Sequence, residues 1–483
     1  MTSQVREHTT PSPPAPVDAL VTQLVRLMPT LMLVALVFLV TKKSSETVSN
    51  PDTFFHLRFG HEFLDGWSIW DPGSVTHFAT APWVPTQWLA EMAMAKVEDW
   101  FGLPGIAWIT GAGFVALTLV VYLACRRVSG AWVSTTIAAL MVIAASDGLS
   151  ARPQQISYLL VVVYAEAWRR TSRDARPRWW LLAPAWFWPM LHGMWPLGIV
   201  VSAVAALGIV ADRRATLSRR QCRDLLALPV SMAVVSALTP VGPKIYPAVL
   251  LVADRGRYYT EWQPPDFHRV PEIALMLLFA VVLVVRIRTG TRSWYVLGSI
   301  VVAAGFCVYS SRTVPVAAGL LALQAAAALG EITDRAQATR RRDGLIAHAV
   351  AGAGLVGLAC AVPFTAAHPA PKPAWIDSEI SALPAGTSLL NDDQDGGYLM
   401  WRYPQVQIWA HGYGDAFTLA QLHRTRQLVD LSPGWPRVLR ASGIRYALLD
   451  PTEPLAYALV HDQGWHLEHR SKDYAWLVAP GAG

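Results

Sequence analysis

Residues 50–91 read NPDTFFHLRFGHEFLDGWSIWDPGSVTHFATAPWVPTQWLAE, and this stretch lies between the first two strongly apolar segments of the chain. It is dense in acidic residues, histidine and tryptophan. Ionisable groups beside membrane-spanning segments are costly unless they sit in a polar cleft. We therefore expect the stretch to form a loop at a membrane surface and to hold a carboxylate with a chemical role.

The composition is that of a polytopic membrane protein. Of the 483 residues, 53% are hydrophobic and only 15% are charged, whereas soluble globular proteins carry about 25% charged residues. The net charge of +6 comes from arginine clusters in short loops between apolar segments, which is typical of cytoplasmic loops. The sequence has no nucleic-acid-binding motif. Its four cysteines show no zinc-ligand spacing.

Apolar runs along the chain predict about eleven transmembrane helices. Some runs, such as 181–191, are short for the ~20 residues of a straight span, so their flanks must complete them or the segment is re-entrant. The runs are 27–40, 105–123, 131–145, 156–167, 181–191, 196–211, 225–238, 273–285, 295–309, 314–329 and 346–362.

The loops between these runs fall into two alternating sets. One set is rich in arginine, and the positive-inside rule places it in the cytoplasm together with the N-terminus. Lys42 and Lys43 are a small violation of that rule. The other set contains every polar segment with a distinctive sequence, so we expect one site on the external face. These external loops are 50–91, 147–155, 191–196, 239–269 and 310–315.

Composition also predicts the domain organisation. Short apolar runs alternate with helical stretches near the C-terminus, which indicates a small extracytoplasmic α/β domain. Within it, residues 391–398, NDDQDGGY, predict a tight turn after a strand. The expected parts are a disordered cytoplasmic N-terminus (1–26), a transmembrane domain (27–363) whose large first external loop is 42–104, a Pro/Ala linker (364–374) and the α/β domain (375–483).

Several of these polar segments carry a resemblance to a known family. PDTFFHLRFG (51–60), WDPGSVTHF (70–78) and WVPTQWLAE (83–91) resemble the first external loop of bacterial GT-C-type membrane glycosyltransferase-like proteins. The resemblance extends over nearly the whole chain from about residue 27. The later segments that fit are ARPQQIS (151–157), LHGMWPLG (191–198), LTPVGPKIY (238–246), EWQPPDF (261–267), the lone Arg312 and NDDQDGGYLMW (391–401).

The resemblance implies a fold, a location and an activity. GT-C enzymes are multi-pass proteins that take a sugar from a polyprenyl-phosphate carrier and transfer it to a glycan, lipid or protein outside the cytoplasm. It therefore implies a GT-C-like protein of the bacterial plasma (inner) membrane. In the family an acidic residue of the first external loop acts as the base or orients the acceptor, and Asp52 matches it. Some branches use two adjacent acids there, and this sequence has only Asp52 after Asn50 and Pro51.

We expect Asp52, His56 and Glu91 to be the catalytic residues. Glycosyl transfer needs a base for the acceptor hydroxyl, and a carboxylate beside an apolar surface gains a raised pKa that suits this task. His56 follows Asp52 by four residues, so both share one helix face. The alternatives are that Asp52 is the N-cap of a helix starting near Thr53, that His56 caps a loop carbonyl, and that Glu91 pairs with an arginine.

A second group of residues is expected to bind substrate. Arg152 and Arg312 lie at the external ends of apolar segments, and their guanidinium groups suit a lipid phosphate. The alternative for both is a salt bridge to Glu91 or Glu261. The remaining candidates are His192, Glu261, Trp262, Asp71 and His77. For Asp71 the alternative is a turn residue in WDPGS, and for Trp262 a place in an interfacial belt.

No cofactor is certain from the sequence, and a divalent cation is left open. NDDQDGGY lacks the spacing and closing glutamate of a calcium loop. The expected partners are a polyprenyl-phosphate-linked sugar, a glycan, lipid or protein acceptor and membrane lipid, without nucleic acid. Two other functions remain: a non-catalytic glycan- or lipid-binding protein on the same scaffold, and a transporter or flippase for an isoprenoid-linked lipid. No mid-span charge suggests a proton relay, which counts against transport.

Overall fold

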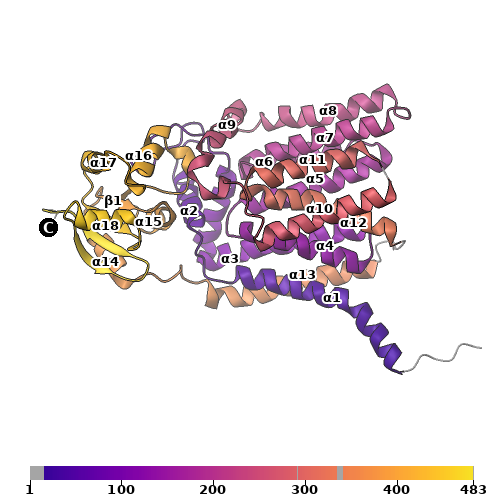
Figure 1. Cartoon of the computed structure of the whole chain (residues 1–483), viewed down its shortest axis with the longest axis horizontal. Coiled ribbons are helices and arrows are strands. Elements are labelled where there is room, and N and C mark those ends of the chain that lie inside the picture. Colours follow the sequence, from indigo (N-terminus) through magenta and orange to yellow (C-terminus); the bar gives the residue numbers. More distant parts are fainter. Residues whose placement is uncertain (1–15, 291, 334–340, 482–483) are drawn as a thin grey trace, which may run out of the picture.

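The computed structural model describes residues 16–290, 292–333 and 341–481. Figure 1 shows a bundle of long helices with a small α/β domain at one end and helix α2 between the two parts. The bundle helices are α1 (Pro16–Ser44), α3 (Trp88–Arg126), α4 (Ala131–Ala144), α5 (Gln154–Asp174), α6 (Leu182–Leu191), α7 (Pro196–Arg213), α8 (Arg219–Ser236), α10 (Val270–Thr289), α11 (Trp294–Tyr309), α12 (Val314–Ile332) and α13 (Arg341–Thr365).

Each predicted apolar run overlaps one of these helices, although α1 and α3 begin well before the runs at 27 and 105. By length and hydropathy, six helical segments of the described chain could cross a membrane, and α4 and α11 are shorter apolar helices. The count of about eleven spans therefore stays a prediction. The six are 26–44, 88–126, 196–213, 270–289, 311–332 and 342–365.

Helix α12 lies at the centre of the bundle. Its sequence, VPVAAGLLALQAAAALGEI, is rich in alanine. It packs against α10, α11, α4, α5 and α3, and it is the most buried of the six long apolar helices. Small side chains let neighbouring helices approach closely and gain dispersion contacts, which is how helices associate where the surroundings are already apolar.

The N-terminal region differs in part from the expected disorder. Residues 16–26 belong to α1, whereas residues 1–15 lie outside the described chain. The helix begins at a proline, which suits the first helical position. Apolar residues then recur along LVTQLVRL, which favours a helix over a disordered tail.

Helix α2 (Pro51–Leu64) forms because its start is well capped. The side chain of Asn50 accepts a hydrogen bond from the backbone N–H of Asp52 at 3.0 Å, and Pro51 occupies the first turn. After Asp65 the chain turns through Gly66, whose φ of 117° is a conformation that L side chains rarely adopt. The helix lies across the end of the bundle, where it packs on α3.

The C-terminal domain is built on a five-stranded sheet with the order β2-β1-β3-β5-β4. Strands β2, β1 and β3 are parallel, and β5 is antiparallel to β3 and β4. The strands are β1 (Ser388–Asn391), β2 (Gln407–Ile408), β3 (Tyr446–Leu449), β4 (His466–Arg470) and β5 (Ala475–Val478). The helices around the sheet are α14 (Ala374–Ala382), α15 (Asp393–Arg402), α16 (Leu419–Val429), α17 (Trp435–Ser442) and α18 (Pro454–His461). Helix α9 (Ile245–Arg255), between α8 and α10 in the chain, contacts this domain at residues 414–416.

The turn expected at residues 391–398 is wrong, because helix α15 starts there at Asp393. Asp393 and Asp395 lie in its first turn, where carboxylates interact favourably with the helix dipole. The two glycines of the segment serve close packing. A Cβ on Gly396 would lie 2.1 Å from the carbonyl oxygen of Ala410, and one on Gly397 would lie 2.1 Å from that of Pro51.

The α/β domain and the loop that follows α2 share one hydrophobic core. The rings of Phe59 and Trp83 lie 5.4 Å apart, and each lies 5.0 Å from the ring of Tyr413. The backbone N–H of Ala81 also donates to the carbonyl oxygen of Ala416 at 2.9 Å. The domain is therefore packed onto α2 in addition to being joined by the linker.

The crossing of α2 and α3 can be tested at Gly60. A Cβ there would lie 2.2 Å from the carbonyl oxygen of Glu91, and backbone cannot give way as a flexible side chain can. We expect Gly60→Ala to destabilise the protein by about 1–3 kcal/mol, measured as thermal unfolding in detergent. The matched control is Gly357→Ala in α13, where nothing lies within 4 Å. Equal stability of the two variants would contradict this packing.

Candidate active site

The start of α2 presents Asp52 and His56 on one helix face. Asn50 is the N-cap, so the alternative that Asp52 fills this role is wrong and its carboxylate is left for other partners. Asp52 is partly buried, with 22% of its side chain exposed. Its Oδ1 faces Gly412, where a Cβ would lie only 2.8 Å away. The site therefore includes a segment of the C-terminal domain.

Arg152 connects two carboxylates at the end of the bundle. Its Nη1 donates to Oδ2 of Asp52 at 2.7 Å and to Oε1 of Glu261 at 2.6 Å. Its Nε donates to Oγ of Ser150 at 2.8 Å, and only 5% of the side chain is exposed. A buried guanidinium needs such partners because its desolvation is otherwise uncompensated. Three loops far apart in the sequence thus meet at one side chain.

Arg312 lies on the other side of Glu261. Its Nε is 3.6 Å from Oε2 of Glu261, which is an ion pair beyond hydrogen-bond distance. The guanidinium carbon sits 5.4 Å from the centre of the Trp262 ring, a cation–π contact. The alternative raised for both arginines, pairing with an external acid, is present here with Glu261. The Nε of Arg312 has no hydrogen-bond partner among the described residues.

His56 and Glu91 form a buried pair beside this ion network. His56 Nδ1 lies 2.9 Å from Oε1 of Glu91, and both side chains are at most 5% exposed. Burial, together with the positive charges of Arg152 and Arg312, holds the pKa of His56 well below its usual value. His56 is therefore neutral, and its pairing is a hydrogen bond to Glu91, not the loop-carbonyl cap raised as the alternative.

His192 is held in one tautomer by its neighbours. Trp188 Nε1 donates to Oγ of Ser157 at 2.7 Å, and that hydroxyl lies 2.8 Å from Nδ1 of His192. The backbone N–H of Met194 also points to Nδ1, at 3.4 Å, so Nδ1 is assigned as an acceptor and the ring proton of His192 to Nε2. Burial and the nearby Arg312 and Arg152 lower the pKa of His192, so the ring is a neutral donor.

The pKa values of the two carboxyls that share Arg152 are shifted in opposite directions. Burial raises the pKa of Asp52, an effect that Arg152 offsets only in part and that Glu261 strengthens. Burial also acts on Glu261, but Arg312 and Arg152 outweigh it and bring the pKa of Glu261 below its usual value. A pair of acids whose pKa values are moved apart is typical of sites that divide proton transfer from charge stabilisation.

Sequence inspection missed a second ion pair near the site. Arg255 of α9 donates from Nη1 to the carbonyl oxygen of Asp415 at 2.9 Å, and its guanidinium lies 3.6 Å from Oδ1 of the same residue. Burial raises the pKa of Asp415 to about 6 against the opposing effect of Arg255. The segment HGYGDAF (411–417) could have indicated this acid, because Gly412 and Gly414 precede Asp415 and allow other segments to approach the backbone closely.

Not every predicted site residue reaches this network. Asp71 is exposed, and the neighbouring Trp70 donates to the carbonyl oxygen of Pro240 at 2.8 Å. His77 lies against the C-terminal domain, 3.4 Å from Oγ of Ser388. In contrast, the charges of Arg152 and Arg312 reach the histidines His56 and His192, and Glu91 is bonded to His56. The other expected residues in or against the ion network are Asp52, Arg152, Glu261, Trp262 and Arg312.

The donor set does not fit a divalent cation. Asp52 and Glu261 are the two carboxylates that face a common point, and the guanidinium of Arg152 occupies that point. Within the described residues no three His, Cys, Asp or Glu side chains are grouped to hold a metal ion. Hard divalent cations prefer several oxygen ligands, so we derive no step through a metal here.

Comparisons with known proteins identify the fold. No protein-family model and no curated protein matches the chain. The structure is similar to that of the Archaeoglobus fulgidus oligosaccharyltransferase tethered with an acceptor peptide containing the NVT sequon, with 12% identity, a TM-score of 0.53, and coverage of 89% of this chain and 70% of that one. The apo form of the same protein is similar with 12% identity and a TM-score of 0.51, and the match covers 87% of this chain and 69% of that one. This likeness supports a GT-C-like membrane fold.

The ion network can be tested by a double-mutant cycle. Arg152→Gln leaves two partly buried carboxylates facing each other, and we expect it to cost about 3–5 kcal/mol of stability. Adding Glu261→Gln removes the repulsion, so the double variant should recover part of the loss, with a coupling of about 0.5–3 kcal/mol. Thermal unfolding in detergent measures both. Strictly additive losses would show that the two side chains do not interact.

Proposed function

We propose that the protein is an integral membrane glycosyltransferase that moves a sugar from a polyprenyl-phosphate donor to a glycan, lipid or protein acceptor outside the cytoplasm. One observation carries the proposal: Asp52, with its raised pKa, shares a buried arginine with Glu261, and a second arginine lies beside them. A base and two cations thus converge where the predicted external loops meet. The GT-C-like fold supports the same chemistry by analogy.

In the proposed step Asp52 acts as the base or orients the acceptor. An oxygen of the acceptor hydroxyl forms a bond to the anomeric carbon as the bond from that carbon to the phosphate oxygen breaks. The hydroxyl proton passes to Asp52, and polyprenyl phosphate leaves with the electron pair. The carboxylate has one oxygen on Arg152, so Oδ1 is the atom left to accept the proton.

The cations serve the leaving phosphate in this proposal. Negative charge grows on the phosphate oxygen as the glycosidic bond breaks, and donors already in place stabilise that charge. Arg312 is suited to it because its Nε has no hydrogen-bond partner in the described structure. The Nε2–H of His192 is a further donor. Trp262 holds the Arg312 guanidinium by its ring face.

His56 and Glu91 are proposed to position the base. The buried pair joins α2 to the first turn of α3, which fixes the rotation of the helix that carries Asp52. A positional error of about 1 Å in such a group lowers catalysis strongly. Loss of this pair should reduce kcat more than it changes KM.

Two other functions use the same scaffold without this step. A non-catalytic glycan- or lipid-binding protein would keep ligand binding and need no base. A transporter or flippase for an isoprenoid-linked lipid would move label across the membrane without transfer. Both are outcomes of the experiment below, which is performed with membranes and labelled polyprenyl-phosphate sugars. The proposed location is the bacterial plasma membrane, with the N-terminus cytoplasmic and the C-terminal domain external.

Loss of the base is the direct test. We expect Asp52→Asn to lower the transfer rate by roughly 10²–10⁴-fold, because general base catalysis contributes about that much. The matched control is Asp65→Asn, which removes an exposed carboxyl from the C-cap of the same helix and should leave transfer unchanged. Label transfer to acceptor is the measurement. Undiminished transfer by Asp52→Asn would remove Asp52 from the chemistry.

The dependence on pH gives a second test. Asp52 must be deprotonated to act as a base, so kcat/KM should rise with pH through its raised pKa. Glu261→Gln removes a negative charge that helps to raise this pKa. The acid limb of the profile of kcat/KM against pH should therefore move to lower pH. A limb that stays in place, or moves to higher pH, would show that another group titrates.

A further inference from the structure

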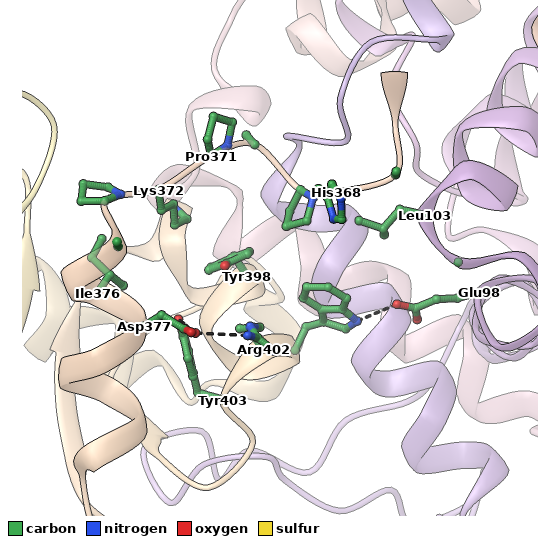
Figure 2. Close-up of a pocket in the computed structure, with 17 residues that line it drawn as sticks. Glu98, Leu103, His368, Pro371, Lys372, Ile376, Asp377, Tyr398, Arg402 and Tyr403 are labelled. Carbon is green, nitrogen blue, oxygen red and sulfur yellow. Dashed lines mark hydrogen bonds and ion pairs between the residues drawn. The ribbon is translucent and has the colours of Figure 1, made fainter. Parts of the chain in front are cut away.

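The C-terminal domain borders two pockets. They differ in whether the charged side chains that line them have partners within the protein. The first has a volume of about 670 Å³ and lies beneath the linker, between α15 and the kinked start of α3. Its charged residues have partners: Arg402 donates to Asp377 at 3.2 Å (Figure 2), and Lys372 pairs with Asp395 at 2.6 Å. Glu98 accepts a hydrogen bond from the indole of Trp401 at 2.8 Å. With its groups paired, this pocket gives no sign of a missing ligand.

The second pocket has a volume of about 600 Å³ and is lined by loop 77–80, α16 and α17. None of its described lining residues is acidic, and two are arginines, Arg424 and Arg437. The remainder are mainly amides, hydroxyls and two aromatic rings. We call this space the α16–α17 pocket.

The two arginines of the α16–α17 pocket lack carboxylate partners in the described part of the chain. Arg424 donates only weakly, from Nε to the carbonyl oxygen of Ala420 at 3.3 Å, and Arg437 has no ion pair. On the same helix as Arg424, Arg426 is paired with Asp430 at 2.9 Å. Both guanidinium groups are exposed to solvent, and no described lining residue of the pocket is acidic, so the two can approach one anion together.

An aromatic pair forms another wall of the pocket. The rings of Phe78 and Trp409 lie 4.8 Å apart. Phe78 is half-buried, which leaves part of its ring open to a ligand. Trp409 is buried, and its indole N–H has no hydrogen-bond partner among the described residues. A buried donor without a hydrogen-bond partner costs free energy. A ligand hydroxyl that accepted a hydrogen bond from this indole N–H would remove that cost.

The α16–α17 pocket is close in the chain to the site around Asp52. Trp409 lies three residues before Gly412, which faces Oδ1 of Asp52. Three residues span at most roughly 11 Å, a distance that a short oligosaccharide can cover. The loop that carries Phe78 also belongs to the stretch 50–91, which contains Asp52. One extended ligand can therefore reach both places.

We propose that the α16–α17 pocket binds an acidic saccharide, the carboxylate-bearing part of the acceptor glycan. The two arginines take the sugar carboxylate, and Phe78 supports a ring face. An anionic lipid head group fits less well, because α17 lies on the part of the domain away from the helical bundle (Figure 1). The acceptor role, unlike the binding itself, rests on the proposed function.

The test is a titration of the full-length protein in detergent with a defined probe. A trimer of galacturonic acid should bind, and its carboxyl-reduced neutral counterpart should bind more weakly. Because hydrogen bonds to charged groups contribute more than neutral ones, we expect the double variant Arg424→Gln/Arg437→Gln to weaken Kd for the acidic trimer roughly 10- to 100-fold. Binding is followed by calorimetry.

The matched control is Arg402→Gln, which removes an arginine of the same domain that is already paired with Asp377. It should leave Kd for the trimer unchanged. Absence of trimer binding, equal loss in the control, or tighter binding of a glutamate peptide or of vesicles with anionic lipid than of the trimer would each overturn the proposal. Circular dichroism and thermal unfolding of the variants exclude loss of the fold as the cause.

The same variants separate this inference from the proposed function. Asp52→Asn should keep the affinity for the trimer, since Asp52 does not line the α16–α17 pocket. The double arginine variant should raise KM for an acidic acceptor and leave kcat nearly unchanged. Intact trimer binding without any transfer by the wild-type protein would contradict the enzyme and leave the saccharide site standing.

Discussion

The hydrogen bonds from Arg152 to Asp52 and Glu261 are the interaction on which the site depends. A guanidinium that is almost fully buried is tolerated only where negative partners surround it. Arg152 comes from the turn before α5, Asp52 from α2 and Glu261 from the segment after α9. An unpaired Arg152 would cost free energy, and this cost holds the three segments in one arrangement.

Helix α2 connects this ion network to the rest of the molecule through its packing. Gly60 brings it against the backbone of α3, and Gly397 brings α15 against its first turn. Its phenylalanines enter the core that the C-terminal domain shares with the loop. The α/β domain is thus held by packing, and its segment 409–415 forms a wall of the site.

The differences from expectation have a common physical origin. Asp71 and His77 stand in the same loop as Asp52, and their residue types suit a site equally well. Whether a loop side chain turns to one neighbour or another depends on partners that are distant in sequence, such as Ser388 for His77. The helix at α15 replaced an expected turn because its glycines pack against Ala410 and Pro51, which no local pattern records.

The sequence by itself indicated a membrane protein, the apolar helices, the alternation of strands and helices near the C-terminus and the side chains from which a site is drawn. These follow from periodicity, composition and caps, which act over a few residues. Only the tertiary structure decided that Arg152 lies between Asp52 and Glu261, that Asp415 joins the site, and that Arg424 and Arg437 share one pocket. Ion pairing and pKa depend on distance in space and on burial, and both are set only when remote segments pack.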